Sequence, residues 1–424
     1  MAKSLSAIRY FGALGVLAAA AGAALAKPPE PGFWLTGLLP NANSGWVTAL
    51  NKDGSVAAGY IGTTTPPAAS SFTWTVAGGR NDFGLGSGMP AINFAYGLSD
   101  YGHIVGNMRV DGQYAKSRAT RWTGTGSLQD LGVLPGETRS FAWGMSGDGN
   151  VVVGHAEHGS MSPLGQAIRW TPTKGMEGIG KLTPQSSISK AHAVSRDGLT
   201  IVGENWNEFL NTDAFVWTQA GGMKALPKLG NPWNTATADG VNADGTVIVG
   251  RSAPMGGGTH MVRWKNGVIE DLVKGTPYSG SWGLAVCDNA EIIAGTNTQG
   301  TFNVALAWSA STGAMELDDY LLLHGVQAPA GYRLDYAWAI SGDGLTFGGQ
   351  ATNLATGVHE GFVATIPGKS CVADCDASGG LDIDDFICFQ TRFAIADPYA
   401  DCDASGELDI DDFICFQTAY AIGC

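Results

Sequence analysis

Charged side chains are scarce in this chain of 424 residues, at 15% of the total, and the negative ones gather at one end. Residues 371–424 hold eleven Asp and one Glu against a single Arg, whereas residues 27–370 are only weakly acidic. No segment clusters Lys and Arg into a basic stripe. Because nucleic-acid binding depends on such clusters to neutralise phosphates, we expect no nucleic-acid partner.

Long apolar runs are also missing beyond the N-terminus. Lys3 and Arg9 precede the apolar run 11–21, and Ala24-Leu25-Ala26 fits a small-x-small cleavage site, so residues 1–26 are predicted to be a secretory signal peptide. The run is too short to span a bilayer. We therefore expect an extracellular protein that is secreted or associated with the cell surface and is not integral to the membrane. A retained N-terminal anchor is the alternative, disfavoured by the proline-rich sequence that follows.

Cysteine is nearly absent from the first 370 residues, where Cys287 stands alone and is predicted to be a buried free thiol. The other six lie in residues 371–424, which favours disulfides in an oxidising compartment. Cys371 and Cys424 bracket this region. The inner four repeat at a period of 27 residues and allow three pairings, or a zinc site as the rival; they are Cys375, Cys388, Cys402 and Cys415.

Glycine, in contrast, is abundant at 62 residues, and it marks a repeat. The clearest copy, 141–154, contains Ser-Gly-Asp-Gly followed by apolar residues and a closing glycine. The other copies are 47–59, 94–106, 190–203, 238–250, 282–295 and 336–349. Their spacing of 45 to 54 residues is the length of a four-stranded propeller blade. The sequence therefore predicts an all-β fold, a seven-bladed β-propeller over residues 27–366.

Each copy predicts an Asp-Gly hairpin with a type I′ turn, a third strand that ends in Trp in six copies, and a fourth strand such as 130–136. The first copy of the fourth strand, 33–40, precedes the first hairpin, and the last repeat ends at 361–366 without one. If blades begin with the hairpin, 33–40 completes the seventh blade and closes the ring. If they begin with the fourth strand, there is no such closure, and the sequence leaves both orders open.

One column inside the repeats varies while its neighbours stay small or aliphatic. Its residues are Thr48, Tyr96, Trp143, His192, Asp239, Leu284 and Trp338. Variation at one place in a symmetric ring is where a ligand site would specialise, and aromatic rings with a His and an Asp suit a carbohydrate or a peptide. We predict ligand contacts for Tyr96, Trp143, His192, Asp239 and Trp338. The plainer interpretation is packing between blades.

Motifs for catalysis are missing from the repeats. There is no Gly-x-Ser-x-Gly elbow, and Gly368-Lys369-Ser370 lacks the first glycine of a phosphate loop. His155 and His158 lack the spacing of a helical zinc site and are predicted to be surface residues. A carboxylate pair assembled from two blades would leave no local pattern, so an enzyme stays possible. We predict no catalytic residues and favour a binding protein.

The acidic end is a second duplication, in which 374–385 and 401–412 each match a calcium loop of the EF-hand type. The alternative is a solvated acidic tail. Such loops require oxygen ligands at fixed positions and a glycine at position 6. The predicted ligands of two Ca²⁺ ions are Asp374, Asp376, Ser378, Gly380, Asp382 and Asp385 in the first loop, and Asp401, Asp403, Ser405, Glu407, Asp409 and Asp412 in the second. Apolar spacing predicts a helix after each loop, at 386–393 and 413–420.

These tandem loop-and-helix motifs resemble a dockerin domain, and the Cys-bracketed form that ends in Gly423-Cys424 is similar to the GC-type dockerin group. The resemblance covers residues 371–424, with the domain itself at 374–424 after a linker at 367–373. It implies docking to a cohesin-like partner or a cell-surface assembly. Partner recognition is implied for Ile383, Asp384, Ile410 and Asp411, which differ from the small-hydroxyl pair of the best-known dockerins. The repeats are similar to the secreted HAF-type repeat family.

The sequence therefore favours a secreted calcium-binding protein that docks through its C-terminal region and presents a propeller as a binding module. One alternative is an extracellular carbohydrate-active hydrolase or lyase that degrades polysaccharide. Another is a structural component of the cell surface.

Overall fold

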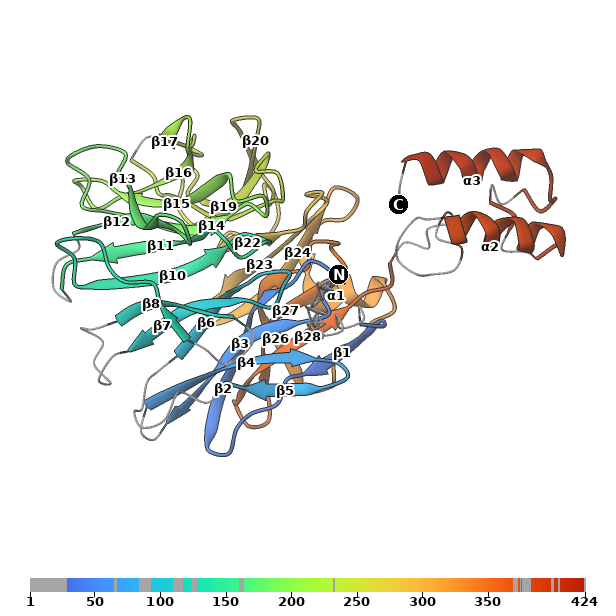
Figure 1. The fold of residues 1–424 in the computed structure, drawn as a ribbon, viewed down its shortest axis with the longest axis horizontal. Coiled ribbons are helices and arrows are strands. Elements are labelled where there is room, and N and C mark those ends of the chain that lie inside the picture. Colours follow the sequence, from blue (N-terminus) through green and yellow to red (C-terminus); the bar gives the residue numbers. More distant parts are fainter. Residues whose placement is uncertain are drawn as a thin grey trace, which may run out of the picture.

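The structure is a computed structural model. It describes residues 29–64, 67–83, 93–109, 117–123, 128–159, 164–231, 233–368, 373, 375, 383–397, 400–402 and 405–422. Within these ranges, the strands form seven antiparallel sheets of four strands each, which follow one another around a ring in chain order (Figure 1). The predicted seven-bladed β-propeller is thus confirmed. Among the described residues, no helix has both the length and the apolar composition needed to cross a membrane.

The strands of the first six blades follow one another in sequence. Blade 1 consists of β2 (Ala42–Leu50), β3 (Ala57–Thr64), β4 (Pro67–Thr75) and β5 (Gly79–Asp82), and blade 2 of β6 (Asn93–Leu98), β7 (Ile104–Arg109), β8 (Ser117–Trp122) and β9 (Leu128–Asp130). Blade 3 consists of β10 (Arg139–Met145), β11 (Val152–Glu157), β12 (Gly165–Thr171) and β13 (Gly175–Gly180), and blade 4 of β14 (Ile188–Val194), β15 (Thr200–Trp206), β16 (Thr212–Thr218) and β17 (Gly222–Ala225). Blade 5 consists of β18 (Ala236–Val241), β19 (Val247–Ser252), β20 (His260–Lys265) and β21 (Val268–Asp271), and blade 6 of β22 (Ser281–Val286), β23 (Ile292–Gln299), β24 (Phe302–Ser309) and β25 (Gly313–Glu316).

Blade 7 joins the two ends of the propeller chain. It consists of β26 (Tyr332–Ile340), β27 (Thr346–Asn353), β28 (His359–Thr365) and the N-terminal strand β1 (Gly32–Leu35). β1 pairs antiparallel with β28, so blades begin with the hairpin and the N-terminal strand closes the ring. Phe33 lies opposite Ala364, which stands where the other six repeats have Trp, and stacks on Phe362 with ring centroids 5.5 Å apart.

The hairpin turns differ from the predicted type I′. In blade 3, the Gly149 N–H donates to the Ser146 carbonyl at 2.9 Å, and only the glycine has a left-handed backbone, with φ +72°. The Asp148 carboxylate accepts from the Ser146 hydroxyl and from the Asn150 N–H. These side-chain bonds stabilise a turn in which Asp148 keeps a negative φ, so the type I′ prediction is wrong.

Tryptophans at the ends of the third strands fill the layers between blades. Trp264 is 1% exposed and packs with Val202 and Ala214 of the preceding blade. The predicted fourth strand 130–136 is wrong in position, because β9 ends at Asp130 and Gly132 turns the chain with φ +81°. A helix that the sequence analysis missed, α1 (Leu317–Leu323), lengthens the last repeat spacing and buries Leu317 and Leu321.

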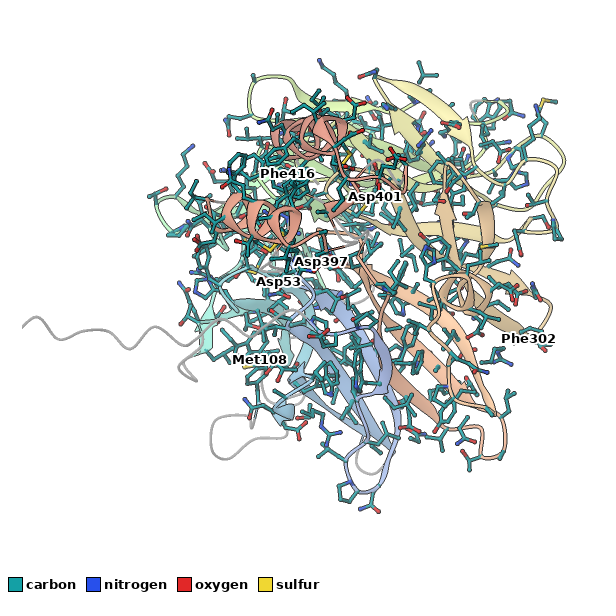
Figure 2. The ribbon with its side chains drawn as sticks, turned by 90° about the vertical axis from the view of Figure 1, so that its right-hand side faces the viewer. Asp53, Met108, Phe302, Asp397, Asp401 and Phe416 are labelled. Atoms are coloured by element: carbon teal, nitrogen blue, oxygen red, sulfur yellow. A yellow bond between two sulfur atoms is a disulfide. The ribbon has the colours of Figure 1, made fainter. Side chains whose placement is uncertain are left out.

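The C-terminal region is helical, as α2 (Ile383–Ala394) and α3 (Ile410–Ile422). Its core centres on Phe389 and Phe416, which are fully buried and stacked with ring centroids 4.1 Å apart. Figure 2 labels Phe416 in this region. Both helices begin three residues before the predicted start. α3 begins earlier because the Asp411 N–H donates to Asp409 Oδ1 at 2.8 Å, which satisfies a free amide of the first turn.

Disulfides tie each of these helices to the segment before it. The bonds are Cys375–Cys388 and Cys402–Cys415, which select one of the three pairings and leave no free thiolates for the rival zinc site. Cys371 and Cys424 lie outside the described residues. Cys287 is buried and free as predicted, with its thiol donating to Asn289 Oδ1.

Candidate binding pocket in the central channel

A cavity of about 440 Å³ lies at the centre of the ring, lined by the first strand of all seven blades. Each first strand contributes three consecutive residues, as Trp143–Met145 in β10, and Tyr60 of β3 adds one more side chain. The volume is within the range of small-molecule sites in proteins.

Every first strand has a β-bulge at this level. In blade 3, the register with β11 shifts between Ala142 and Gly144, so Trp143 has no partner in the ladder. The equivalent unpaired residues are Thr48, Tyr96, His192, Asp239, Leu284 and Trp338. These are the seven members of the variable column, and all of them line the pocket. The bulges turn these side chains out of the ladder and place them on the channel wall.

The glycine that closes each repeat makes this bulge possible. A Cβ added to Gly154 would lie 1.8 Å from the Phe141 carbonyl oxygen, which leans over the glycine from the first strand. In each of the other six blades, the equivalent first-strand carbonyl oxygen would lie 1.7 to 2.1 Å from a Cβ added to the repeat-closing glycine. These glycines are Gly59, Gly106, Gly203, Gly250, Gly295 and Gly349. No other residue type fits there, so the glycine that closes each repeat marks the position of a bulge in the neighbouring strand.

Aromatic side chains form one wall of the pocket, across blades 1 to 3. The ring of Tyr96 lies 4.7 Å from that of Trp143 and 5.8 Å from that of Tyr60, between centroids. The Trp143 Nε1–H donates to His155 Nδ1 at 2.9 Å. Burial holds the pKa of His155 well below its ordinary value, so this ring is a neutral acceptor.

The pocket residues His192 and Asp239 form a polar wall across blades 4 and 5, with Lys190 and Glu204 beside them. His192 Nδ1 is 3.1 Å from Asp239 Oδ1, and Lys190 Nζ is 3.1 Å from Glu204 Oε1. Burial alone would lower the pKa of His192, but the hydrogen bond to Asp239 and the charges of Asp239 and Glu204 outweigh it, and the pKa is raised. Two cations then face two carboxylates, so this wall carries no net charge when His192 is protonated.

Two buried polar atoms at the pocket lack hydrogen-bond partners. Asp239 Oδ2 is an unpaired acceptor, and Trp338 Nε1–H is an unpaired donor. An unpaired buried polar group costs roughly 1–3 kcal/mol. Both atoms are closed off from solvent, so a ligand that supplies a donor and an acceptor would satisfy them after the Asp239 carboxylate and the Trp338 indole turn toward the pocket.

Sequence reasoning missed three residues of the site, namely Tyr60, which lines the pocket, and the buried His155 and Glu204, which contact the pocket residues Trp143 and His192. Each directly follows a repeat-closing glycine, so a second column of the repeat carries them. The prediction that His155 is a surface residue is wrong, because it is 5% exposed in β11. His158 is exposed, as predicted.

The packing interpretation of the variable column holds for some members. Thr48 Oγ1 donates to the Ala95 carbonyl of the next blade at 2.8 Å, and the Tyr96–Trp143 contact also joins two blades. Packing between blades does not account for Asp239 and Trp338, because each has a buried polar atom without a hydrogen-bond partner.

The second predicted calcium loop is largely described. Gly406, at position 6, has φ +85°, the sharp bend that the loop requires. Asp412 is fully buried, and its two oxygens accept from the Cys402 and Asp409 N–H groups at 2.8 and 2.9 Å. Asp401 Oδ2 accepts from the Gly406 N–H at 2.9 Å, whereas its Oδ1 is buried without a partner. The carboxylate oxygens of Asp401 and Asp412, including the unpaired Asp401 Oδ1, are ligands of the type that a hard cation takes.

Several predicted ligands lie outside the described residues, namely Asp374, Asp376, Ser378, Gly380, Asp382 and Asp403. In the part of the chain that is described, no three His, Cys, Asp or Glu residues are grouped as a metal site. Of the predicted ligands of the first loop, only Asp385 is described, and it is fully buried. Ser405 and Glu407 are exposed, and the Ser405 hydroxyl donates to the Glu407 carbonyl at 3.1 Å.

The predicted docking residues begin the two C-terminal helices. Ile383 and Ile410 are 67% and 69% exposed, large values for isoleucine. Asp384 and Asp411 follow them in the first turns. Ile387 and Ile414, one turn later, are exposed as well, so each helix presents an isoleucine pair.

No family model matches the chain, and the comparison with curated proteins finds no match. The solved structures that it resembles include an oligogalacturonate lyase in complex with manganese, at 11% identity and TM-score 0.52, covering 77% of this chain and 90% of the lyase. Another is the β-propeller domain of the Trilobed protease from Pyrococcus furiosus, at 10% identity and TM-score 0.51, covering 76% and 95%. A prolyl endopeptidase, at 9% identity and TM-score 0.51, is matched over 77% of this chain but only 51% of its own. Likeness at these identities shows the β-propeller fold alone.

Proposed function

We propose that this protein is a secreted carbohydrate-binding protein whose central pocket holds a neutral sugar. The observation that carries this proposal is the pairing of an unsatisfied acceptor, Asp239 Oδ2, with an unsatisfied donor, Trp338 Nε1–H, in one aromatic-lined pocket. A sugar hydroxyl both donates and accepts, and its C–H faces stack on aromatic rings. The balanced charges around His192 favour an uncharged ligand over an acidic one.

The test is a binding screen of the full chain against soluble glucans, xylans, mannans and polygalacturonate, scored for both retention and release of reducing ends. We expect retention by a neutral polysaccharide without release. W338F and D239N should each weaken binding about tenfold, the loss expected for about 1.4 kcal/mol. Matched controls are W233F and D319N, because both side chains are exposed away from the pocket. Retention by none of the three neutral polymers would contradict the proposal, even if polygalacturonate were retained.

A hydrolase or lyase is the second candidate. The observation in its favour is that His192 lies between two carboxylates, with its Nε2 3.9 Å from Glu204 Oε1 and its Nδ1 3.1 Å from Asp239 Oδ1. Such an arrangement could move a proton. Release of reducing ends that is lost in H192Q and kept in the control H158Q would establish the enzyme and displace the binding protein.

We also infer that the C-terminal region binds calcium and docks the protein to a cohesin-like or cell-surface partner. Asp401, Ser405 and Asp412 would hold the ion of the second loop, and bound Ca²⁺ would offset the repulsion among the crowded carboxylates. In the full chain, EGTA should lower the far-ultraviolet helix signal and CaCl₂ should restore it. D401N should weaken the response, and D319N in the propeller should not. A helix signal that ignores both reagents would rule out the calcium site.

The docking surface is proposed from the exposed isoleucine pairs. Ile383 and Ile410 are more than two-thirds exposed at equivalent places of a duplicated unit. A pull-down with immobilised full chain, and with the double variant I383S/I410S, tests this surface. The partner should be captured by the natural chain and lost with the double variant, whereas the control I395S, also exposed, should retain it.

A further inference from the structure

The turns that join the first two strands of each blade gather at one end of the pocket. They directly follow the pocket-lining residues, and backbone bonds link them from blade to blade. The Asp100 N–H donates to the Gly147 carbonyl at 2.9 Å, and the Gly147 N–H to the Arg196 carbonyl at 2.9 Å. On the far side, the Asp343 N–H donates to the Lys52 carbonyl at 3.0 Å. The channel therefore narrows to a ring of turns at this end.

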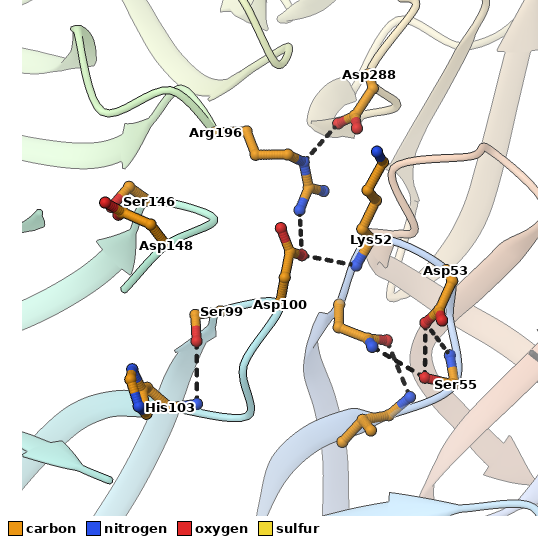
Figure 3. A network of polar contacts seen from close by, with 12 residues as sticks. Lys52, Asp53, Ser55, Ser99, Asp100, His103, Ser146, Asp148, Arg196 and Asp288 are labelled. Carbon is orange, nitrogen blue, oxygen red and sulfur yellow. Dashed lines mark hydrogen bonds and ion pairs between the residues drawn. The ribbon is translucent and has the colours of Figure 1, made fainter. Parts of the chain in front are cut away.

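Arg196 crosses this ring. It lies in the turn of blade 4, and its guanidinium binds Asp100 of blade 2 through Nη1 and Asp288 of blade 6 through Nε, the latter at 2.9 Å (Figure 3). Neither blade is a neighbour of blade 4. A side chain that reaches both must lie over the axis of the channel.

Two glycines leave the space that Arg196 occupies. A Cβ added to Gly147 of blade 3 would lie 2.4 Å from Arg196 Cγ. A Cβ added to Gly342 of blade 7, across the ring, would lie 2.8 Å from Arg196 Nη2. The arginine is therefore within contact of the turns of four other blades, and its side chain occupies the centre of the ring.

The contacts hold Arg196 in its charged form. Burial alone would lower the pKa of its guanidinium, but the charges of Asp288 and Asp100 outweigh this and raise it. Asp100 is held in turn by the Lys52 N–H, which donates to its Oδ1 at 3.0 Å. Three charged side chains, each about one-quarter exposed, thus form one fixed cluster at the end of the pocket.

We propose that Arg196, with Asp100 and Asp288, closes the channel at the turn end, so that the pocket is blind and takes the end of a sugar chain. This inference rests on the proposed carbohydrate binding. A chain bound along its middle must leave a pocket on two sides, whereas a blind pocket admits only a terminal unit. The specificity is then for chain ends of a neutral oligosaccharide or polysaccharide.

The first test measures closure without any sugar. Ala193 lines the pocket on blade 4, and replacing it by Cys in a C287S background gives the propeller one reactive thiol. We expect a small methanethiosulfonate reagent to label this thiol at least fivefold faster after R196A, because a second entrance opens. R251A is the control, since Arg251 packs on Trp282. D100N/D288N, which removes the two carboxylates that hold the guanidinium over the axis, serves if R196A does not fold and should raise the rate as well. An unchanged labelling rate would overturn the closure.

The second test measures what the closed pocket binds. A neutral polysaccharide retained in the screen is partly hydrolysed to increase its chain ends at constant mass. Bound protein at saturation should rise in proportion to the number of ends. A stoichiometry that follows total chain length instead would overturn chain-end recognition while leaving carbohydrate binding intact. If no neutral polysaccharide binds, the proposed function is wrong. The labelling rate then still decides whether Arg196 closes the channel.

Discussion

The propeller and the C-terminal helical region solve the problem of stability in different ways. The propeller buries Trp and aliphatic side chains between seven blades, and the only cysteine among its described residues is the free thiol Cys287. The helical region has a small core around Phe389 and Phe416 and two disulfides. A short chain buries too little apolar surface to be stable alone, so it needs cross-links or ions. The large ring instead tolerates seven bulges and unpaired polar atoms at its centre.

Reduction of the disulfides should produce the largest difference in stability between the two regions. Each bond closes a loop of 13 residues, for which chain entropy gives about 3 kcal/mol. We expect dithiothreitol to abolish the helix signal of α2 and α3 while the near-ultraviolet signal of the propeller tryptophans persists. Retention of the full helix signal after reduction would show that the disulfides are dispensable.

A glycine substitution at a bulge should be the largest single change in the propeller. G154A places a Cβ 1.8 Å from the Phe141 carbonyl and should cost about 3–4 kcal/mol in the free energy of unfolding. The control G175A, where φ is +72° and the space is open, should cost only about 1 kcal/mol. Urea unfolding of both variants measures the difference. Equal costs would mean that the bulge carbonyl moves aside easily.

His192 of the pocket and the buried His155, which contacts Trp143, should have smaller and opposite effects on the pH dependence of stability. The pKa of His155 is lowered in the folded state, so the unfolded chain binds its proton first and stability falls as the pH drops below about 6.5. The pKa of His192 is raised, so its stabilisation is present below about pH 6.5 and is lost as the pH rises through the folded value. Relative to the natural protein, H155Q should therefore weaken the loss of stability at acid pH, and H192Q should enhance it. The same change of slope in both variants would contradict this assignment.

Much of the ring could be predicted from the sequence. The 45 to 54 residue period gave the number of blades, and segment 33–40 was recognised as a possible closing strand because its repeat position was otherwise empty. The hairpin type was predicted wrongly, because the Asp-Gly pair does not reveal the side-chain bonds of Ser146 and Asp148.

The pocket could be predicted only in part. Variation picked out the column, but the bulge that places Trp143 in the channel has no signature beyond the partner glycine, Gly154. The contact between His192 and Asp239 joins residues 47 positions apart in different blades, and Arg196 meets Asp100 over 96 positions. Contacts of this kind depend on how the blades close into a ring, which a repeat pattern alone does not encode.

The most direct measurement of carbohydrate binding in the channel is the indole N–H signal of Trp338 in the ¹⁵N-labelled full chain, assigned by its disappearance in W338F. On addition of a neutral polysaccharide fragment that binds, this signal should shift strongly as the unpaired donor gains an acceptor, and the signal of exposed Trp233 should not move. A bound fragment that leaves the Trp338 signal in place would show that the central pocket is not the binding site.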